Sequence, residues 1–351
     1  MKVLCEYSPG GSSFVRSAWG RVFRACGHDF RFWVPETKSA FDAFAEFEPE
    51  LYIGTTYGLP NAVIKCLKAR QGRIRTILFA SAWGPWIADL DKAKYPVVVV
   101  TDDEKRGVEQ VRPDFVFIHA HGKYLEGTMS GWSEIGVPYR GVLNAADLYI
   151  YLGGQFRPEF ECDIAFVGGR WPYKARNIDR YILPLCEKSK GLRAKVFGNT
   201  VWPVGQYLGT VRDEEVKDIF CSALVCPSVS EPHSTDLGWD VIERPFKVLA
   251  SGGFCVGDFV QEARDLFAED ELPMGRSPEE FEALIHHFIK DRYLAAEIAA
   301  KGRAKVLTRH TYHDRVAQFF TDLGMPHEAK TVFQDKERLL RTLPEAAWLQ
   351  D

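Results

Sequence analysis

The segment 224–262 reads LVCPSVSEPHSTDLGWDVIERPFKVLASGGFCVGDFVQE, and its order of apolar and polar residues decides the expected fold. The apolar run from Leu224 to Cys226 predicts a strand, and the polar residues after it predict a loop. A short helix is expected from Pro245 up to Gly252, because proline is favoured in the first turn of a helix and glycine just past the last. A second strand and a turn complete the segment.

The start of this expected helix is suited to binding an anion. Arg244 precedes the proline, and the backbone N–H groups of Phe246 and Lys247 follow it. The first N–H groups of a helix have no partner within the helix and lie at the positive end of its dipole. The sequence therefore predicts a phosphate-binding site here, with a surface loop and a buried α/β crossover as the alternative.

Length and composition indicate a globular protein of two domains. A chain of 351 residues is longer than one small hydrophobic core requires. Its net charge of −4 gives no whole-chain attraction for nucleic acid or an anionic membrane.

The eight cysteines form no Cys-x-x-Cys pair and are expected to be buried thiols. With no secretory pattern in the first residues, MKVLCEYSPGG, and no apolar run of membrane-spanning length, a cytoplasmic protein is expected.

Strand-like runs in the first half alternate with helical stretches, which is typical of a doubly wound parallel sheet. The runs cover residues 2–7, 29–34, 51–53, 75–80, 97–100 and 115–118. The first helix is expected to bury Phe14, Ala18 and Val22, which fall four residues apart, and to end at Gly27.

Two passages resemble a known family. The passages YLGTVRDEEVKDIFCSALVCPSVSEP (207–232) and ERPFKVLASGGFCVGD (243–258) are similar to the C-terminal half of retaining nucleotide-sugar glycosyltransferases of the GT-B fold, most of all the CgeB-like group, named after a spore maturation protein. The resemblance covers residues 138–313. It implies an α/β protein with two Rossmann-like doubly wound domains that face an interdomain cleft. The expected parts are an acceptor-side domain (1–155), a nucleotide-sugar-binding domain (156–310) and a helical tail returning to the first domain (311–351).

Ligands of such sheets bind beyond the carboxyl ends of the strands. After the first strand comes a glycine turn with Gly10, Gly11 and Ser12, which we expect on the acceptor or sugar side. A tight turn with a serine helix cap is the alternative. Trp83 follows a later strand, where an aromatic ring would suit stacking on a sugar or base, although a buried tryptophan is equally consistent with the pattern.

His119 and His121 alternate at another strand end, so both are expected to point to one side. Because no third ligand is spaced nearby, a metal ion is not expected. We expect His119 to act as an acid or base or to hydrogen-bond a substrate hydroxyl, and His121 to lie on the acceptor side. Purely structural histidines are the alternative.

The second half holds the expected donor site. Gly169, Arg170 and Lys174 follow the strand expected at 163–167, and glycine with basic residues at a helix entry suits a pyrophosphate. A solvated basic face is the alternative. The resemblance implies that Arg170 and Lys174 bind the donor phosphates. It also assigns Gly198 and Asn199 to the nucleotide and Glu231 to catalysis through hydroxyls of the donor sugar. His233, in the same loop as Glu231, is expected on the acceptor or sugar side.

Lys247 stands where many of the resembling enzymes have a glutamate that contacts the ribose. We expect Lys247 to contact a phosphate instead, and Glu243, one turn earlier, to take the ribose. The resulting prediction is a retaining hexosyltransferase (class EC 2.4) that needs no metal or cofactor and uses a UDP-sugar. The alternatives are a nucleotide-sugar epimerase of the same fold and a non-catalytic nucleotide-sugar-binding protein. The acceptor stays open among saccharide, protein, small metabolite and modified nucleic-acid base, as does the oligomeric state.

Overall fold

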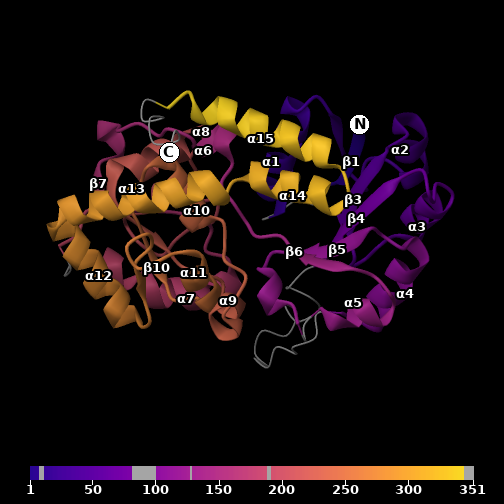
Figure 1. The fold of residues 1–351 in the computed structure, drawn as a ribbon. Coiled ribbons are helices and arrows are strands. Elements are labelled where there is room, and N and C mark those ends of the chain that lie inside the picture. Colours follow the sequence, from indigo (N-terminus) through magenta and orange to yellow (C-terminus); the bar gives the residue numbers. More distant parts are fainter. Residues whose placement is uncertain (8–11, 81–99, 127–128, 188–190, 344–351) are drawn as a thin grey trace. The chain divides into compact units, whose positions relative to one another are not determined.

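The computed structural model describes residues 1–7, 12–80, 100–126, 129–187 and 191–343. Its contacts divide the chain into two compact units, each built on one parallel sheet (Figure 1). Unit 1 comprises Met1–Leu143 and Tyr312–Arg338, and unit 2 comprises Asn144–Thr311 and Leu339–Asp351.

Residues 144–155, which the sequence analysis assigned to the first domain, make their contacts in unit 2. The side-chain Nδ2 of Asn144 donates to the carbonyl oxygen of Val241 at 2.9 Å. The backbone N–H of Gly154 donates to the carbonyl oxygen of Ser251 at 3.1 Å. These bonds attach the segment to unit 2 before the first strand of its sheet begins.

Unit 1 contains a parallel sheet of six strands in the order β2-β1-β3-β4-β5-β6. The strands are β1 (Lys2–Glu6), β2 (Asp29–Trp33), β3 (Leu51–Thr55), β4 (Arg75–Phe79), β5 (Phe115–Ile118) and β6 (Tyr139–Gly141). The doubly wound sheet predicted from the alternating runs is confirmed, and five of those runs coincide with strands. The run at 97–100 lies outside the described residues except for Val100.

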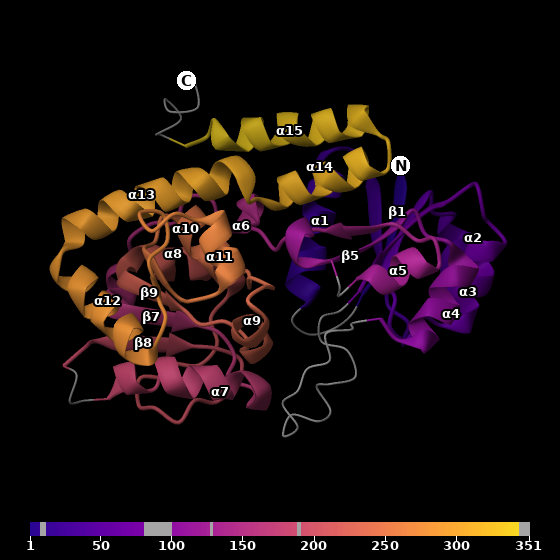
Figure 2. The same cartoon turned by 60° about the horizontal axis from the view of Figure 1, so that its bottom comes forward.

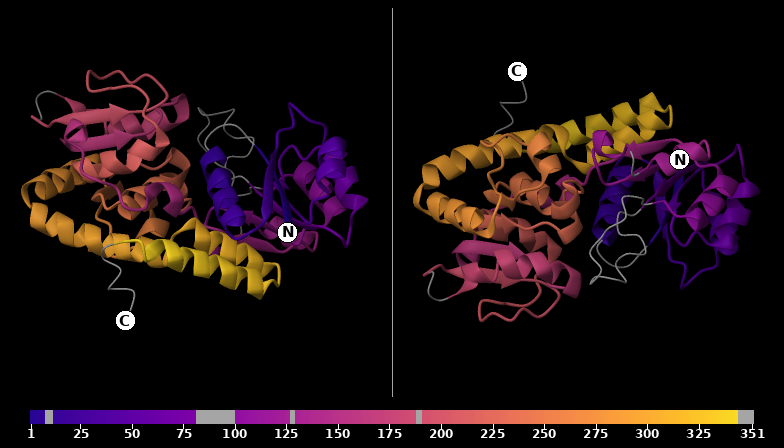
Figure 3. Two further views of the ribbon diagram at one scale, coloured as in Figure 1. Left: turned by 90° about the horizontal axis from the view of Figure 1, so that it is seen from above. Right: turned by 90° about the horizontal axis from the view of Figure 1, so that it is seen from below.

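Helices cover both faces of this sheet (Figure 3). On one face α2 (Ala40–Phe47), α3 (Asn61–Lys68) and α4 (Asp102–Val111) pack in succession, and on the other α1 (Ser12–Ala25) packs on α14 (Tyr312–Asp322). The unit also contains η2 (Gly122–Tyr124), α5 (Ser130–Glu134) and most of α15 (Pro326–Leu340).

Helix α1 buries two of the three residues predicted for its apolar face, because Ala18 and Val22 are 1% and 0% exposed. Val15, Trp19 and Val22 are 5%, 2% and 0% exposed, whereas Phe14 is 45% exposed. The assignment of Phe14 to the buried face is wrong. At 3.6 residues per turn, Phe14 lies about 100° from the centre of the buried stripe.

Unit 2 contains a parallel sheet of five strands in the order β11-β10-β9-β7-β8. The strands are β7 (Cys162–Val167), β8 (Ala194–Phe197), β9 (Ala223–Ser228), β10 (Cys255–Asp258) and β11 (Met274–Gly275). Helices α6 (Leu148–Tyr151), α8 (Asp213–Ser222), α10 (Arg244–Ser251) and α13 (Arg292–Arg309) pack together on one face, and α7 (Pro172–Tyr181) and α12 (Pro278–Lys290) on the other (Figure 2). Shorter elements are η3 (Pro158–Phe160), η4 (Pro184–Cys186), α9 (Pro232–Leu237) and α11 (Gln261–Leu266).

The segment 224–262 folds mostly as predicted. Helix α10 spans Arg244–Ser251 and ends at Gly252, whose φ of 95° is favourable only for glycine. The prediction of a continuous loop before it is wrong, because α9 forms within that loop. Pro232 starts this helix and Gly238, with φ of 78°, ends it. Six residues are too few to show a helical apolar period, so these two end signals were its only trace in the sequence.

Each sheet has one point where the chain reverses its direction of winding. In unit 1, β1 pairs with β2 on one side and β3 on the other; in unit 2, β7 pairs with β8 on one side and β9 on the other. The carboxyl ends of β1 and β3, and of β7 and β9, therefore form the two switch points at which such sheets bind ligands. Within the described part of the chain, no helix is long and apolar enough to cross a membrane.

Candidate functional site

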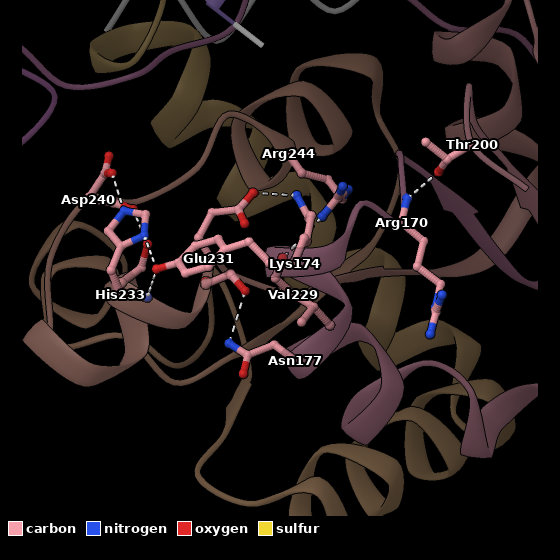
Figure 4. A network of polar contacts seen from close by, with 12 residues as sticks. Arg170, Lys174, Asn177, Thr200, Val229, Glu231, His233, Asp240 and Arg244 are labelled. Carbon is pink, nitrogen blue, oxygen red and sulfur yellow. Dashed lines mark hydrogen bonds and ion pairs between the residues drawn. The ribbon is translucent and has the colours of Figure 1, made fainter. Parts of the chain in front are cut away.

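Three charged side chains converge at the switch point of unit 2 (Figure 4). Lys174 from α7 donates from Nζ to Oε1 of Glu231 at 2.8 Å, and both residues are buried. Arg244, the first residue of α10, donates from Nε to the carbonyl oxygen of Val167 at 3.2 Å and from Nη1 to that of Val229 at 3.3 Å. The guanidinium thus joins the carboxyl ends of β7 and β9, and the expected Lys174, Glu231 and Arg244 come together.

Glu231 has an oxygen that the protein does not satisfy. Its Oε2 is buried and has no hydrogen-bond partner among the residues that the structure describes. The residue precedes α9, but its side chain makes no capping bond there. A buried carboxylate oxygen left unpaired is costly, so the site is suited to a ligand that supplies a hydroxyl or N–H donor.

The two cations are held in a poorly solvated position. Burial lowers the pKa of Lys174, the carboxylate of Glu231 opposes this, and the charge of Arg244 reinforces it. Burial likewise lowers the pKa of Arg244, again opposed by Glu231. A bound anion would favour the charged forms of both groups, so their environment is suited to a phosphate.

A second layer of hydrogen bonds fixes the loop that carries Glu231. The backbone N–H of Ser230 donates to the carboxylate of Asp258 at 3.0 Å, and its hydroxyl donates at 2.8 Å. Asn177 of α7 donates from Nδ2 to the carbonyl oxygen of Ser230 at 3.1 Å. Burial raises the pKa of Asp258 to about 6, although the bonds from Ser230 act against the shift. The sequence analysis missed Asp258 and Asn177, because only the adjacency of β9 and β10 and the face of α7 bring them to this loop.

His233, which is expected on the acceptor or sugar side, lies inside unit 2 with 3% of its surface exposed. Its Nε2 is 2.7 Å from the Oδ2 of Asp240, which can only accept, so Nε2 carries a proton. Its Nδ1 is 3.1 Å from the hydroxyl of Tyr173 on α7. Asp240, at φ of 69°, is held by Oε2 of Glu262, which accepts its backbone N–H at 2.8 Å. His233 therefore ties α9 to α7, next to Lys174.

Arg170, the other residue of the turn after β7 that was expected to bind phosphate, forms an ion pair with Asp179 instead. Arg170 donates from Nη2 to Oδ2 of Asp179 at 2.6 Å, and Figure 4 shows its side chain directed away from Lys174 and Glu231. Its backbone N–H donates to the hydroxyl of Thr200 in the turn after β8.

The glycines of these turns permit a close approach of backbone. A Cβ on Gly198 would lie 2.2 Å from the carbonyl oxygen of Gly168, and one on Gly169 would lie 2.8 Å from Oδ1 of Asn199. The predicted nucleotide residues Gly198 and Asn199 thus lie directly beside the predicted phosphate turn.

Lys247 and Glu243 form an ion pair one helical turn apart, with 3.0 Å between Nζ and Oε2. The Nζ of Lys247 also lies 5.3 Å from the ring centroid of Tyr151. Burial acts to lower the pKa of Lys247, but the Glu243 carboxylate raises it above its usual range. Both charges are therefore compensated within unit 2, and their ribose and phosphate contacts stay predictions.

In unit 1, His119 follows β5 and packs against Phe79, with 4.7 Å between ring centroids. Its Nδ1 lies 2.9 Å from the carbonyl oxygen of Val142, which can only accept. Nδ1 therefore carries the proton, and Nε2 has the lone pair in the neutral ring. His121, in contrast, is exposed, and its Nδ1 accepts the backbone N–H of Lys123 at 3.3 Å.

Most of the other residues expected on the acceptor side lie outside the part of the chain that the structure describes. Gly10, Gly11 and Trp83 lie outside the described residues, and Ser12 is described only as the first residue of α1. No group of three or more His, Cys, Asp or Glu side chains within the described ranges is placed to hold a metal ion. The expected metal independence stays a prediction.

Comparisons with known proteins cover the part of the chain that forms this site. Residues 170–321 match a family model described as "Glycosyl transferase-like". This segment begins in the turn after β7 and contains Lys174, Glu231 and Arg244. A comparison with curated proteins found no match.

Solved structures cover nearly the whole chain. Sucrose-phosphate synthase from Thermosynechococcus elongatus is 10% identical with a TM-score of 0.63, over 91% of this chain and 97% of that one. The chain has the GT-B fold. An α-glucosyltransferase in complex with UDP-glucose and DNA containing an abasic site is 12% identical, with a TM-score of 0.61, over 92% and 98%. The protein HepE of Anabaena in complex with UDP and glucose is 13% identical, with a TM-score of 0.58, over 92% and 99%. This confirms the predicted fold class, two Rossmann-like α/β domains of the GT-B type.

Proposed function

We propose that the protein is a glycosyltransferase that binds a nucleotide-sugar donor at the switch point of unit 2 and transfers the sugar to an acceptor bound by unit 1. The family-model match and the GT-B fold support this function. The observation that carries it is the buried group of Lys174, Glu231 and Arg244, in which Glu231 Oε2 has no partner within the described structure.

A nucleotide sugar fits the chemistry of this group. Transfer breaks the bond between the anomeric carbon and the diphosphate, so negative charge grows on the departing phosphate oxygen. Lys174 and Arg244 can stabilise that charge in a poorly solvated site, where such interactions are strong. Glu231 can accept a sugar hydroxyl through Oε2. We propose a UDP-sugar, because two of the similar structures contain UDP with glucose or UDP-glucose.

On the acceptor side, His119 is the residue we propose to contact the attacking hydroxyl. The bond from its Nδ1 to Val142 leaves the lone pair on Nε2, which can accept the hydroxyl proton. Retention of the anomeric configuration, and a reaction that proceeds without a metal ion, are proposed from the resemblance and from the two cations.

The test is calorimetric titration with uridine, UDP and UDP-glucose in the presence of a chelator, together with an assay of donor turnover. We expect UDP to bind more tightly than uridine, because the phosphates contact Lys174 and Arg244. Glu231→Gln should leave UDP affinity nearly unchanged but lower turnover about 10- to 100-fold, as loss of a charged hydrogen bond does. The control is Glu297→Gln, whose side chain is 62% exposed. No binding of UDP or of any other nucleoside diphosphate would contradict the function, and a strict need for Mg²⁺ or Mn²⁺ would contradict metal independence.

A further inference from the structure

The switch point of unit 1 holds a polar group that the sequence analysis did not single out. Glu6, the last residue of β1, accepts from the hydroxyl of Tyr52 at 3.2 Å and from that of Thr55 at 3.4 Å. Arg16 of α1 donates from Nη1 to the carbonyl oxygen of Glu6. The charge of Arg16 also acts on the Glu6 carboxyl, so a guanidinium and a carboxylate are both present where this sheet would bind its ligand.

The guanidinium of Arg16 is not fully satisfied. The residue is 2% exposed, and within the described structure its Nη2 is buried with no hydrogen-bond partner. Burial raises the pKa of the Glu6 carboxyl, while the charge of Arg16 acts against this shift. A buried cation with an unused donor is unusual for a purely structural residue, so this position is suited to a ligand atom that accepts a hydrogen bond.

The pairing of opposite charges selects the kind of ligand. An anion would be attracted by Arg16 but repelled by Glu6, and a cation would meet the reverse. A hydroxyl satisfies both, because its O–H donates to the carboxylate while its oxygen accepts from the guanidinium. Neutral, hydroxyl-rich molecules such as sugars therefore fit this site better than charged ones.

An aromatic ring lies next to this polar group. Tyr57 is 39% exposed, and its carbonyl oxygen accepts from the hydroxyl of Thr55 at 3.2 Å. Its ring lies 6.5 Å from that of Phe79, which in turn packs on His119. The side chains thus form a continuous row from the switch point to the histidine proposed to contact the acceptor. Aromatic faces beside carboxylates suit the apolar face and hydroxyl edge of a pyranose.

We propose that Glu6, Arg16 and Tyr57 form a subsite for a saccharide acceptor, a proposal that rests on the proposed transferase function. A nucleic-acid acceptor, as in the similar α-glucosyltransferase structure with DNA, fits less well. Besides Glu6, the edge carries Glu104, whose Oε1 accepts from the hydroxyl of Thr56 at 2.9 Å. These carboxylates would repel phosphates, whereas proteins bind DNA mainly through lysine and arginine contacts to its backbone.

The test is saturation-transfer NMR, which detects binding without requiring turnover. The probes are maltose, cellobiose and lactose, with a short DNA duplex as the competing acceptor class and UDP as the ligand of unit 2. We expect at least one disaccharide to bind. Glu6→Gln and Tyr57→Ala should each weaken that binding about tenfold. Tyr57→Phe should retain most of it, because the ring remains. The control, Tyr293→Ala in unit 2, replaces a side chain that is 94% exposed and should change nothing.

The outcomes separate this inference from the proposed function. Loss of disaccharide binding in Tyr57→Ala with unchanged UDP binding supports the subsite. The inference is overturned if no disaccharide binds, if the duplex binds in preference, or if Tyr57→Ala and Glu6→Gln bind normally. Absence of binding by UDP and every other nucleoside diphosphate, with a disaccharide still bound, contradicts the proposed function alone. If Glu6→Gln fails to fold by circular dichroism, Tyr57→Ala decides, because Tyr57 is 39% exposed and its loss leaves the bonds of Tyr52 and Thr55 to Glu6 in place.

Discussion

The two sheets have the same kind of switch point but different charges there. In unit 2, Lys174 and Arg244 lie at the strand ends with Glu231, and the carboxylate of Asp258 is turned to Ser230. In unit 1, one guanidinium, Arg16, donates to the backbone carbonyl of Glu6, and its charge acts on the single carboxylate of that residue. The excess of cations suits the phosphates of a donor, and the balanced pair suits neutral hydroxyls. One topology thus supports two ligand chemistries through a single additional cation.

Removing a cation from unit 2 tests its side of this comparison most strongly. Lys174→Met leaves the buried carboxylate of Glu231 without its partner, so the free energy of unfolding should fall by about 3–5 kcal/mol. The double variant Lys174→Met with Glu231→Leu should recover part of this loss, because the buried pair is removed as a whole while Arg244 keeps its bonds to the carbonyl oxygens of Val167 and Val229. Denaturant unfolding gives both values. Lys301→Met, which removes the surface ion pairs to Asp270 and Glu297, is the control and should cost at most about 1 kcal/mol. Equal losses in both lysine variants would show that the buried pair is not desolvated.

Asp258 gives unit 2 a pH dependence of stability. Burial raises its pKa to about 6, whereas the unfolded carboxyl titrates near ~3.9. Between these pH values the folded state holds a proton that the unfolded state releases, so this group's contribution to stability decreases as pH rises, by at most ~3 kcal/mol. Asp258→Asn should remove that decrease. The free energy of unfolding should be measured from about pH 4 to about pH 8. The stability of the variant relative to the wild type should increase up to about pH 6 and then stay constant. A difference that is constant with pH would contradict the assignment.

Arg244 distinguishes phosphate binding from support of the strands. Arg244→Ala should lower UDP affinity by roughly 1.5–3 kcal/mol, or about 10- to 100-fold, and leave uridine affinity unchanged. Arg244→Lys should lower UDP affinity less than Arg244→Ala does, because lysine keeps the positive charge. It should still bind UDP more weakly than the wild type, because lysine lacks the planar guanidinium that bonds to Val167 and Val229. Calorimetry with UDP and uridine measures both, and Arg212→Ala, with a side chain 77% exposed, is the control. Equal losses for uridine and UDP would mean that the residue supports only the fold.

His119 extends the test to the acceptor side. Because its Nδ1 proton is held by Val142, Nε2 is the atom proposed to meet the acceptor hydroxyl. His119→Ala should lower turnover about tenfold, the loss expected for one hydrogen bond, with little change in UDP affinity. Steady-state kinetics and calorimetry separate the two quantities, with the exposed His327→Ala as control. A change in UDP affinity with normal turnover would place His119 on the donor side instead.

Local signals and the family resemblance together predicted the candidate site, but only the fold shows how it is completed. The helix start at Pro245 indicated Arg244, the basic turn after a strand indicated Lys174, and the resemblance indicated Glu231. Asp258 and Asn177 depend on the order of the strands and the face of a helix, which no local pattern encodes.

Charge pairing is the second feature that local patterns did not reveal. Arg170 is nine residues from its ion-pair partner Asp179, and Arg16 is ten residues from Glu6, whose backbone carbonyl it contacts. Neither spacing is a helical turn, so both contacts depend on how a turn or a helix packs on its sheet. The basic residues after β7 looked equivalent in the sequence, whereas the structure pairs Arg170 with Asp179 and Lys174 with Glu231.

Lys247 should give the smallest effect, and its size decides whether a third cation belongs to the donor site. Its Nζ bonds Glu243 and lies over the Tyr151 ring, so its charge is already compensated within unit 2. Lys247→Ala should therefore lower UDP affinity by less than about 1 kcal/mol, about fivefold at most. Lys247→Glu should lose more, because two carboxylates one turn apart repel each other. Both are measured by the titrations used for Arg244. If Lys247→Ala lowers UDP affinity as much as Arg244→Ala does, the ammonium leaves Glu243 to bind phosphate. The switch point of unit 2 then has two more cations than that of unit 1. If Lys247→Glu improves binding, the position contacts the ribose, as the glutamate of the resembling enzymes does.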